Sequence, residues 1–128
     1  MADRGKISLA GGVGSPTAAV PILPSADLER SRAFYAFLGF TVLDLAEDYL
    51  RVRLDDAELH LYPAPEIDPG SNAAGWYLRT AYPDELRDKW TADGLECPAV
   101  PVPRYFGETL FAVFDPDGNM LRVGPLAG

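Results

Sequence analysis

The strongest constraint on the fold is an internal repeat, in which capping residues and strand-like runs recur about 55 residues apart. The matched positions are Val20 with Trp76, Asp27 with Asp84, and Gly39 with Gly94. The pattern predicts that each half forms a strand, a helix and three further strands. Because such a unit leaves an apolar face uncovered, it needs a partner unit to bury that face. We therefore predict an α+β fold of two β-α-β-β-β modules that enclose a cleft.

The first module shows clear signals for where its elements begin and end. Its predicted elements are a strand at 19–23, a helix that ends at Leu38, and strands at 49–54 and 58–62. Pro21 has no N–H to donate to a central ladder, which favours an edge or interface position for the first strand. Ser25 and Asp27 are candidate N-caps of the helix, and Gly39 is its expected C-terminal cap.

The second module follows a connector at 63–74 that contains three prolines. Its predicted elements are a strand at 76–81, a helix with Pro83 in its first turn, and strands at 110–114 and 120–124. The segment 115–119, Asp-Pro-Asp-Gly-Asn, is typical of a hairpin turn, and we assign it no catalytic role. We expect 1–16 to form a flexible arm, and 17–126 to form one domain with modules at about 17–64 and 74–126.

Charge and cysteine content exclude several classes of function. The 11 Lys and Arg against 19 Asp and Glu give a net charge of −8, and no basic cluster is present. Nucleic-acid binding is therefore not expected, whereas cationic ligands are favoured. Cys97 is the only cysteine, so no internal disulfide can form. Because no apolar run is long enough to cross a membrane and no secretory signal is evident, we expect no membrane association and a cytoplasmic protein.

Two motifs resemble those of a known family. The run Asp27–Tyr35 followed by Leu38-Gly39-Phe40, together with Phe114–Asn119, is similar to the vicinal oxygen chelate superfamily of glyoxalases, extradiol dioxygenases and bleomycin-resistance proteins. The resemblance covers about 17–125. It implies that the paired modules form a U-shaped, eight-stranded sheet around the cleft, and that the protein acts as a homodimer.

The resemblance also bears on metal binding. Enzymes of this superfamily hold a divalent metal with His, Glu or Gln side chains on strands one, four, five and eight. At three of these places the sequence offers Val20, Trp76 and Arg122, none of which is a usable ligand. His60 is the only histidine, so a site of two histidines and one carboxylate is excluded. We therefore predict no metal, no cofactor and no catalytic residue.

Among metal-free relatives, the sequence most resembles the bleomycin-binding resistance proteins, which sequester the drug without altering it. Aromatic residues could stack on a planar group of the ligand, and acidic residues could meet a cationic tail. The resemblance places Trp76, Tyr49 and the Tyr105-Phe106 pair at cleft positions. The predicted ligand-binding residues are Trp76, Phe106, Tyr105, Tyr49, Asp44, Glu47, His60 and Tyr62. We predict a small-molecule antibiotic of the bleomycin type as the partner, bound in a cleft at the dimer interface.

The sequence also departs from that pattern. Tyr105-Phe106 stands where a tryptophan is expected. Asp44 stands where an aromatic residue is expected, and Leu43 stands where an acidic residue is expected. Two alternatives therefore stay open: a metal-dependent enzyme of the glyoxalase or dioxygenase type, and a protein that binds another planar aromatic metabolite or antibiotic, such as a mitomycin.

Overall fold

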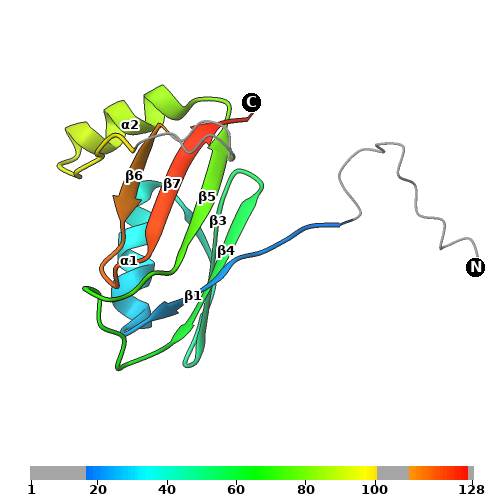
Figure 1. The fold of residues 1–128 in the computed structure, drawn as a ribbon. Helices are drawn as coiled ribbons and strands as arrows, with labels where there is room; N and C mark the ends of the chain where they lie inside the picture. The colour runs from blue at the N-terminus through cyan, green and yellow to red at the C-terminus, as the bar shows by residue number, and fades with distance from the viewer. Residues whose placement is uncertain (1–16, 101–109, 127–128) are drawn as a thin grey trace, which may run out of the picture.

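The computed structural model describes residues 17–100 and 110–126 (Figure 1). Its elements in chain order are β1 (Ile22–Ser25), α1 (Leu28–Leu38), β2 (Thr41–Ala46), β3 (Tyr49–Leu54), β4 (Ala57–Pro63), β5 (Gly75–Thr80), α2 (Pro83–Ala92), β6 (Phe111–Phe114) and β7 (Met120–Pro125). The predicted arm at 1–16 lies outside the described residues. The α+β class predicted from the sequence is confirmed.

The strands form two sheets, one from each half of the chain. The first sheet has the order β1-β4-β3-β2 and the second has the order β5-β7-β6. In each sheet the first strand of the half pairs in parallel with the last, as β1 does with β4 and β5 with β7. The last two strands of each half, β3 with β4 and β6 with β7, form an antiparallel hairpin. Over the described residues the first half has the predicted order of strand, helix and three strands, and the second half has a strand, a helix and two strands with the same parallel pairing of first and last strand.

The single eight-stranded sheet remains a prediction. Seven strands lie within 17–100 and 110–126, in sheets of four and three. Residues 101–109 between α2 and β6 lie outside the described part. Just before them, the carbonyl of Pro98 accepts a hydrogen bond of 3.0 Å from the N–H of Ala112, and Ala99 forms an isolated bridge with Phe111. The chain therefore runs beside β6, where an added strand of the second sheet belongs.

The first helix follows its capping signals. Asp27 is the N-cap, and its carboxylate accepts a hydrogen bond of 3.2 Å from the N–H of Arg30. Gly39 ends the helix with φ of 107°, in the left-handed region that favours glycine. Leu28, Ser31, Tyr35 and Leu38 make the buried stripe. The predicted helix ends are confirmed.

The first strand begins later than predicted. The sequence favoured 19–23, whereas β1 spans Ile22–Ser25 and 17–21 form no strand. Pro21 explains the shift, because it lacks an N–H and contributes only its carbonyl, which accepts from the N–H of His60 at 3.0 Å. β1 is an edge strand of its sheet, as Pro21 indicated. In Figure 1 the chain before β1 runs outward from the two sheets.

The core lies between the sheets and the helices. α1 packs against β2, β3 and β4, and α2 packs against β7. Trp90 of α2 is fully buried, and its indole N–H donates to the carbonyl of Leu38 at 2.9 Å, which ties the end of α2 to the end of α1. No helix in the described part of the chain is long and apolar enough to span a membrane.

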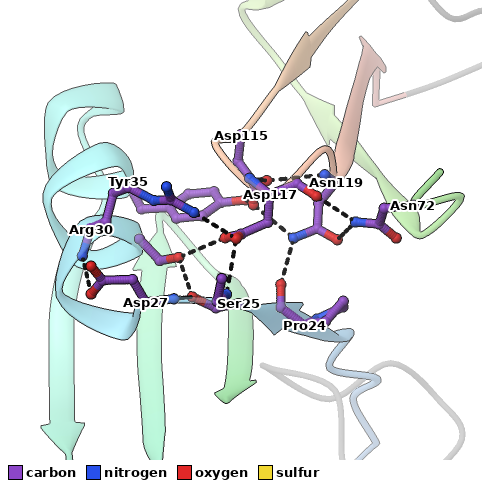
Figure 2. Close-up of polar contacts among 11 residues, drawn as sticks. Pro24, Ser25, Asp27, Arg30, Tyr35, Asn72, Asp115, Asp117 and Asn119 are labelled. Atoms are coloured by element: carbon purple, nitrogen blue, oxygen red, sulfur yellow. Dashed lines mark hydrogen bonds and ion pairs between the residues drawn. The ribbon is translucent and has the colours of Figure 1, made fainter. Parts of the chain in front are cut away.

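A buried polar cluster joins the two halves, and we call Asp115, Asp117 and Asn119 of the β6–β7 turn the turn hub (Figure 2). Asp117 accepts hydrogen bonds from the N–H of Ala26 at 2.9 Å, from Arg30 Nη2 at 2.8 Å and from Ser31 Oγ at 3.2 Å. The hub thus binds the start of α1 to the last hairpin.

The rest of the hub fixes the ends of neighbouring elements. Asn119 donates from Nδ2 to the carbonyl of Pro24 at 2.9 Å and receives a hydrogen bond of 2.9 Å from Asn72 Nδ2. The hydroxyl of Tyr35 donates to Asp115 Oδ2 at 2.7 Å. Burial raises the pKa of Tyr35 well above its ordinary value, and the nearby charge of Asp115 raises it further. Burial also raises the pKa of Asp115, although hydrogen bonds from Asn119 and Tyr35 oppose the rise.

Candidate functional site

Alternation along β3 and β4 gathers polar side chains on one face of the first sheet. Leu50, Val52, Leu59 and Leu61 are fully buried on the core face. Their neighbours in the chain point the other way, because successive residues of a strand face opposite sides. This outer face carries Tyr49 and Arg51 from β3 and Glu58, His60 and Tyr62 from β4.

Four of these side chains form a connected network, which we call the cleft network: Tyr49, Arg51, Glu58 and His60. The hydroxyl of Tyr49 lies 2.8 Å from His60 Nδ1, and the two rings meet edge to face with centroids 5.2 Å apart. His60 Nε2 lies 2.5 Å from Glu58 Oε2. Arg51 Nε lies 3.6 Å from the same oxygen. The network is half-buried, so one side of it meets solvent.

The ionised form of Glu58 is stabilised by its partners. The hydrogen bond from His60 lowers the pKa of Glu58 below its ordinary value, and the charge of Arg51 lowers it further, while partial desolvation acts in the opposite direction. The carboxylate is therefore charged at neutral pH and acts only as a hydrogen-bond acceptor. It can orient the imidazole ring of His60.

Trp76 of β5 lies apart from this network. Its ring packs edge to face on Phe40, with centroids 6.2 Å apart, and its register partner Leu121 is buried. Its indole Nε1 is buried and has no hydrogen-bond partner among the described residues. The next residue, Tyr77, lies opposite Arg122 of β7, and Arg79 lies over its ring at 5.8 Å from the centroid. Trp76 therefore anchors β5, the strand that also carries Tyr77, to the core.

A hollow of about 580 Å³ lies between the two halves. It is lined by Ala18, Ala19, Val20, Pro21, Asp56, Ala57, Glu58, Trp76, Tyr77, Leu78 and Arg79. Glu58 belongs to both this lining and the cleft network, so the network begins at the wall of the hollow. A smaller hollow of about 290 Å³ lies beside it, lined by Gly75, Trp76, Tyr77, Met120 and Arg122 among others. Together they form an aromatic surface with charges of both signs.

Gly75 is required by the close approach of β5 and β7 at the smaller hollow. A Cβ atom on Gly75 would lie 2.6 Å from the backbone carbonyl oxygen of Met120, which no side chain can tolerate without movement of the strand. The glycine therefore keeps the wall beside Trp76 in place.

The structure brings together half of the predicted ligand-binding residues. Tyr49, His60 and Tyr62 share the outer face of the first sheet, and Asp44 of β2 is the register partner of Arg51. Glu47 is exposed in the turn between β2 and β3. Trp76 lies at the hollow, on the other module. Tyr105 and Phe106 fall outside the described residues.

Sequence reasoning did not select Arg51, Glu58, Tyr77 or Arg79 as site residues. The signal for Arg51 and Glu58 was present, because each lies two residues from a selected residue on the same strand, Arg51 from Tyr49 and Glu58 from His60, and so shares its face. Tyr77 and Arg79 lie on the predicted strand at 76–81. They face away from Trp76, which was the residue selected on this strand. Within residues 17–100 and 110–126, no three His, Cys, Asp or Glu side chains gather into a group that could hold a metal ion.

Comparison with known proteins adds a family and several relatives. The family model described as "Glyoxalase/Bleomycin resistance protein/Dioxygenase superfamily" matches residues 17–123. A bleomycin resistance protein of Klebsiella pneumoniae is 29% identical over 115 residues, which cover 82% of this chain and 89% of that protein.

Two solved structures are also similar. A bleomycin-binding protein in complex with bleomycin has a TM-score of 0.76 and 26% identity, over 84% of this chain and 96% of that one. A bleomycin resistance determinant encoded on the transposon Tn5 gives the same TM-score and identity, over 84% of this chain and 95% of that one.

Proposed function

The chain belongs to the Glyoxalase/Bleomycin resistance protein/Dioxygenase superfamily, and from this premise we propose that it is a binding protein that holds a bleomycin-type glycopeptide antibiotic intact and so confers resistance. The similarity to bleomycin-binding and bleomycin resistance proteins supports this choice within the superfamily. In this proposal the protein sequesters its ligand and does not transform it.

The observation that carries the proposal is the hollow of about 580 Å³ beside Trp76 and Tyr77. Its aromatic lining suits a flat conjugated group, because each ring contact contributes about 0.5–1.5 kcal/mol beyond the area it buries. Glu58 and Asp56 bring negative charge to the same wall, and the whole chain has a net charge of −8. A planar ligand with a cationic tail matches this combination.

Affinity and association rate are expected to come from different residues. The stacked and desolvated centre at Trp76 and Tyr77 supplies most of the affinity, since a few buried aromatic side chains usually dominate binding. Exposed carboxylates such as Asp44 and Glu47 act mainly on the association rate and on its dependence on salt. The predicted ligand-binding set of Trp76, Tyr49, Asp44, Glu47, His60 and Tyr62 thus divides into two roles, and Tyr105 and Phe106 belong to the aromatic group in this proposal.

Two further features belong to the proposal. We place the drug in a cleft between two copies of the chain, because residues 18–21, which line the hollow, belong to a segment that runs outward from the two sheets. We also propose that binding needs no metal held by the protein. What supports this is the donor set: the chain has one histidine, and Arg122 places a cation on the wall of the smaller hollow.

Isothermal titration calorimetry tests the proposed function. Metal-free bleomycin and copper-bleomycin should each bind at about one molecule per chain, and the drug recovered afterwards should be chemically unchanged. Absence of heat at high micromolar concentrations would remove bleomycin as the ligand. A matched titration of Asp93→Ala, which alters an exposed pair on α2 far from the hollow, should reproduce the result of the unmodified chain.

A further inference from the structure

We propose that the Tyr49 hydroxyl recognises a hydrogen-bond donor of the ligand, an amine or amide N–H, and that the protonation of His60 decides whether this hydroxyl can accept that bond. The inference rests on the proposed function and names the ligand chemistry that one part of the site selects. It follows from the order of contacts along the cleft network.

The first step is the position of the imidazole proton. Glu58 Oε2 lies 2.5 Å from His60 Nε2, and a carboxylate can only accept. Nε2 therefore carries a hydrogen. In the neutral ring the other nitrogen, Nδ1, is then an acceptor with a free lone pair.

The second step is the direction of the phenol hydrogen. Tyr49 Oη lies 2.8 Å from His60 Nδ1, so with a neutral ring the hydroxyl must donate its hydrogen to that nitrogen. Only the lone pairs of Tyr49 Oη then remain available to form a hydrogen bond with a ligand. Because Tyr49 is half-buried on the outer face, its oxygen then offers an acceptor to a donor group.

Protonation of His60 reverses this polarity. Both ring nitrogens become donors, so Nδ1–H must donate to Tyr49 Oη, and the phenol hydrogen turns away from the ring. One lone pair of the hydroxyl is then occupied by Nδ1–H and its hydrogen faces the ligand, so the hydroxyl favours a ligand acceptor over a ligand N–H. One proton on His60 thus changes the ligand group that Tyr49 accepts.

The surroundings of His60 add charge but no second switch of this kind. The titratable or charged side chains on the strands around it are Tyr49, Arg51 and Arg53 on β3, Glu58 and Tyr62 on β4, and Asp44 on β2 next to Arg51. From β1 the register partner of His60 is Ile22, which carries no charge. Across the hollow, β5 contributes Tyr77 and Arg79. Of these, Tyr49 and Glu58 are hydrogen-bonded to the imidazole.

Nitrogen-15 NMR of the ligand-free protein tests the geometry. His60 is the only histidine in the chain, so its two ring nitrogens can be observed without assignment of other histidines. In the neutral imidazole we expect Nε2 to have the chemical shift of a protonated nitrogen and Nδ1 that of an unprotonated one. The opposite tautomer would overturn the inference, whatever the protein binds.

Calorimetry with metal-free bleomycin between about pH 5 and pH 8, where histidine side chains change charge, tests the consequence for binding. From pH 8 to pH 5 the unmodified chain should lose about threefold to tenfold more affinity than Tyr49→Phe, the size of one hydrogen bond. Titration of the drug itself affects both proteins equally and cancels in this comparison. His60→Gln, which cannot take up a proton, should have the shallow pH profile of Tyr49→Phe.

Asp93→Ala is the control. It alters an exposed pair with Lys89 at the end of α2, outside the residues placed at the binding site, and it should keep the pH slope of the unmodified chain. Equal slopes for the unmodified chain, Tyr49→Phe and His60→Gln would overturn the inference but leave the proposed function standing. Absence of binding by the unmodified chain at every pH would overturn the proposed function, and with it the role of Tyr49 toward this ligand.

Discussion

The turn hub and the cleft network are both built from polar and ionisable side chains, but they have different roles. In the hub, Asp117 and Asn119 are almost completely buried, and their side chains form hydrogen bonds with backbone and side-chain groups from distant parts of the chain. In the cleft network, the side chains of His60 and Glu58 remain 18% and 30% exposed, and one end of the network opens on a hollow. The difference teaches that burial, more than composition, separates the two roles. A polar network whose groups are all buried and hydrogen-bonded stabilises the fold, whereas one that remains exposed on one side is available to bind a ligand.

Energetics follow the same division. A buried carboxylate that accepts several hydrogen bonds leaves unsatisfied donors when it is removed, and that loss is large. A half-exposed pair is partly replaced by water, so its loss costs the fold little. Substitutions in the hub should therefore affect stability, and substitutions around the cleft should affect ligand binding.

Asp117→Ala gives the largest expected effect. It leaves the N–H of Ala26 without its acceptor and removes the hydrogen bonds that the carboxylate accepts from Ser31 and from half-exposed Arg30, so the free energy of unfolding should fall by about 3–5 kcal/mol. Urea denaturation followed by circular dichroism measures this change. The control Asp93→Ala, in an exposed pair with Lys89, should change stability by less than about 1 kcal/mol. Equal losses in the two variants would contradict the comparison.

Tyr35→Phe sharpens the hub side of the comparison. Loss of the hydrogen bond to the buried carboxyl group of Asp115 should lower the free energy of unfolding by about 1–2 kcal/mol near pH 7. Because the folded pKa of Tyr35 is raised, the unfolded chain ionises first, and stability is lost as the pH rises above the ordinary tyrosine value of 10.0. Tyr35→Phe should lose less stability over that alkaline interval. Parallel alkaline losses, measured by denaturation at stepwise pH, would show that Tyr35 does not carry this dependence.

Trp76→Ala tests the cleft side. We expect drug affinity to fall by about 1–3 kcal/mol, because a stacking surface is removed from the hollow, while the protein stays folded. Trp76→Phe, which preserves an aromatic ring against Phe40, separates ligand stacking from core packing. Calorimetry and circular dichroism measure both properties. If affinity is unchanged and stability falls, Trp76 belongs to the core alone.

Glu58→Gln gives the smallest expected effect on the fold. The lowered pKa of Glu58 contributes stability above its ordinary value of 4.5, and this contribution disappears as the pH falls through the folded value. The midpoint of urea denaturation should therefore be slightly lower for Glu58→Gln near pH 7, and the difference from the unmodified chain should shrink as the pH falls below 4.5. A difference that grows toward acid pH would contradict the direction of the pKa shift.

Local signals in the sequence were sufficient for most of the fold. Asp27 and Gly39 marked the ends of α1, and alternation from Tyr49 to Leu54 separated the core face from the outer face. These features depend on neighbours in the chain, which a sequence displays directly. The start of β1 was missed because Pro21 fits a strand in composition while it cannot donate within one.

Contacts between distant parts of the chain could not be predicted in the same way. The β6–β7 turn has ordinary turn composition, and nothing local indicates that Asp117 meets Ala26 and Arg30 about 90 residues earlier. The cleft network was half visible, since His60 was selected and Glu58 was not. The bond between His60 and Tyr49 depends on the register of β3 against β4. That register is set by the backbone conformation of the turn at Asp55, which the sequence does not specify.

A crystal structure of the protein with metal-free bleomycin tests the central claim most directly. The account predicts intact drug in the hollow between Glu58 and Tyr77, with a planar group against Trp76 and an N–H group within hydrogen-bond distance of Tyr49 Oη. Drug bound away from this hollow, or a cation coordinated within it beside a transformed ligand, would contradict the account.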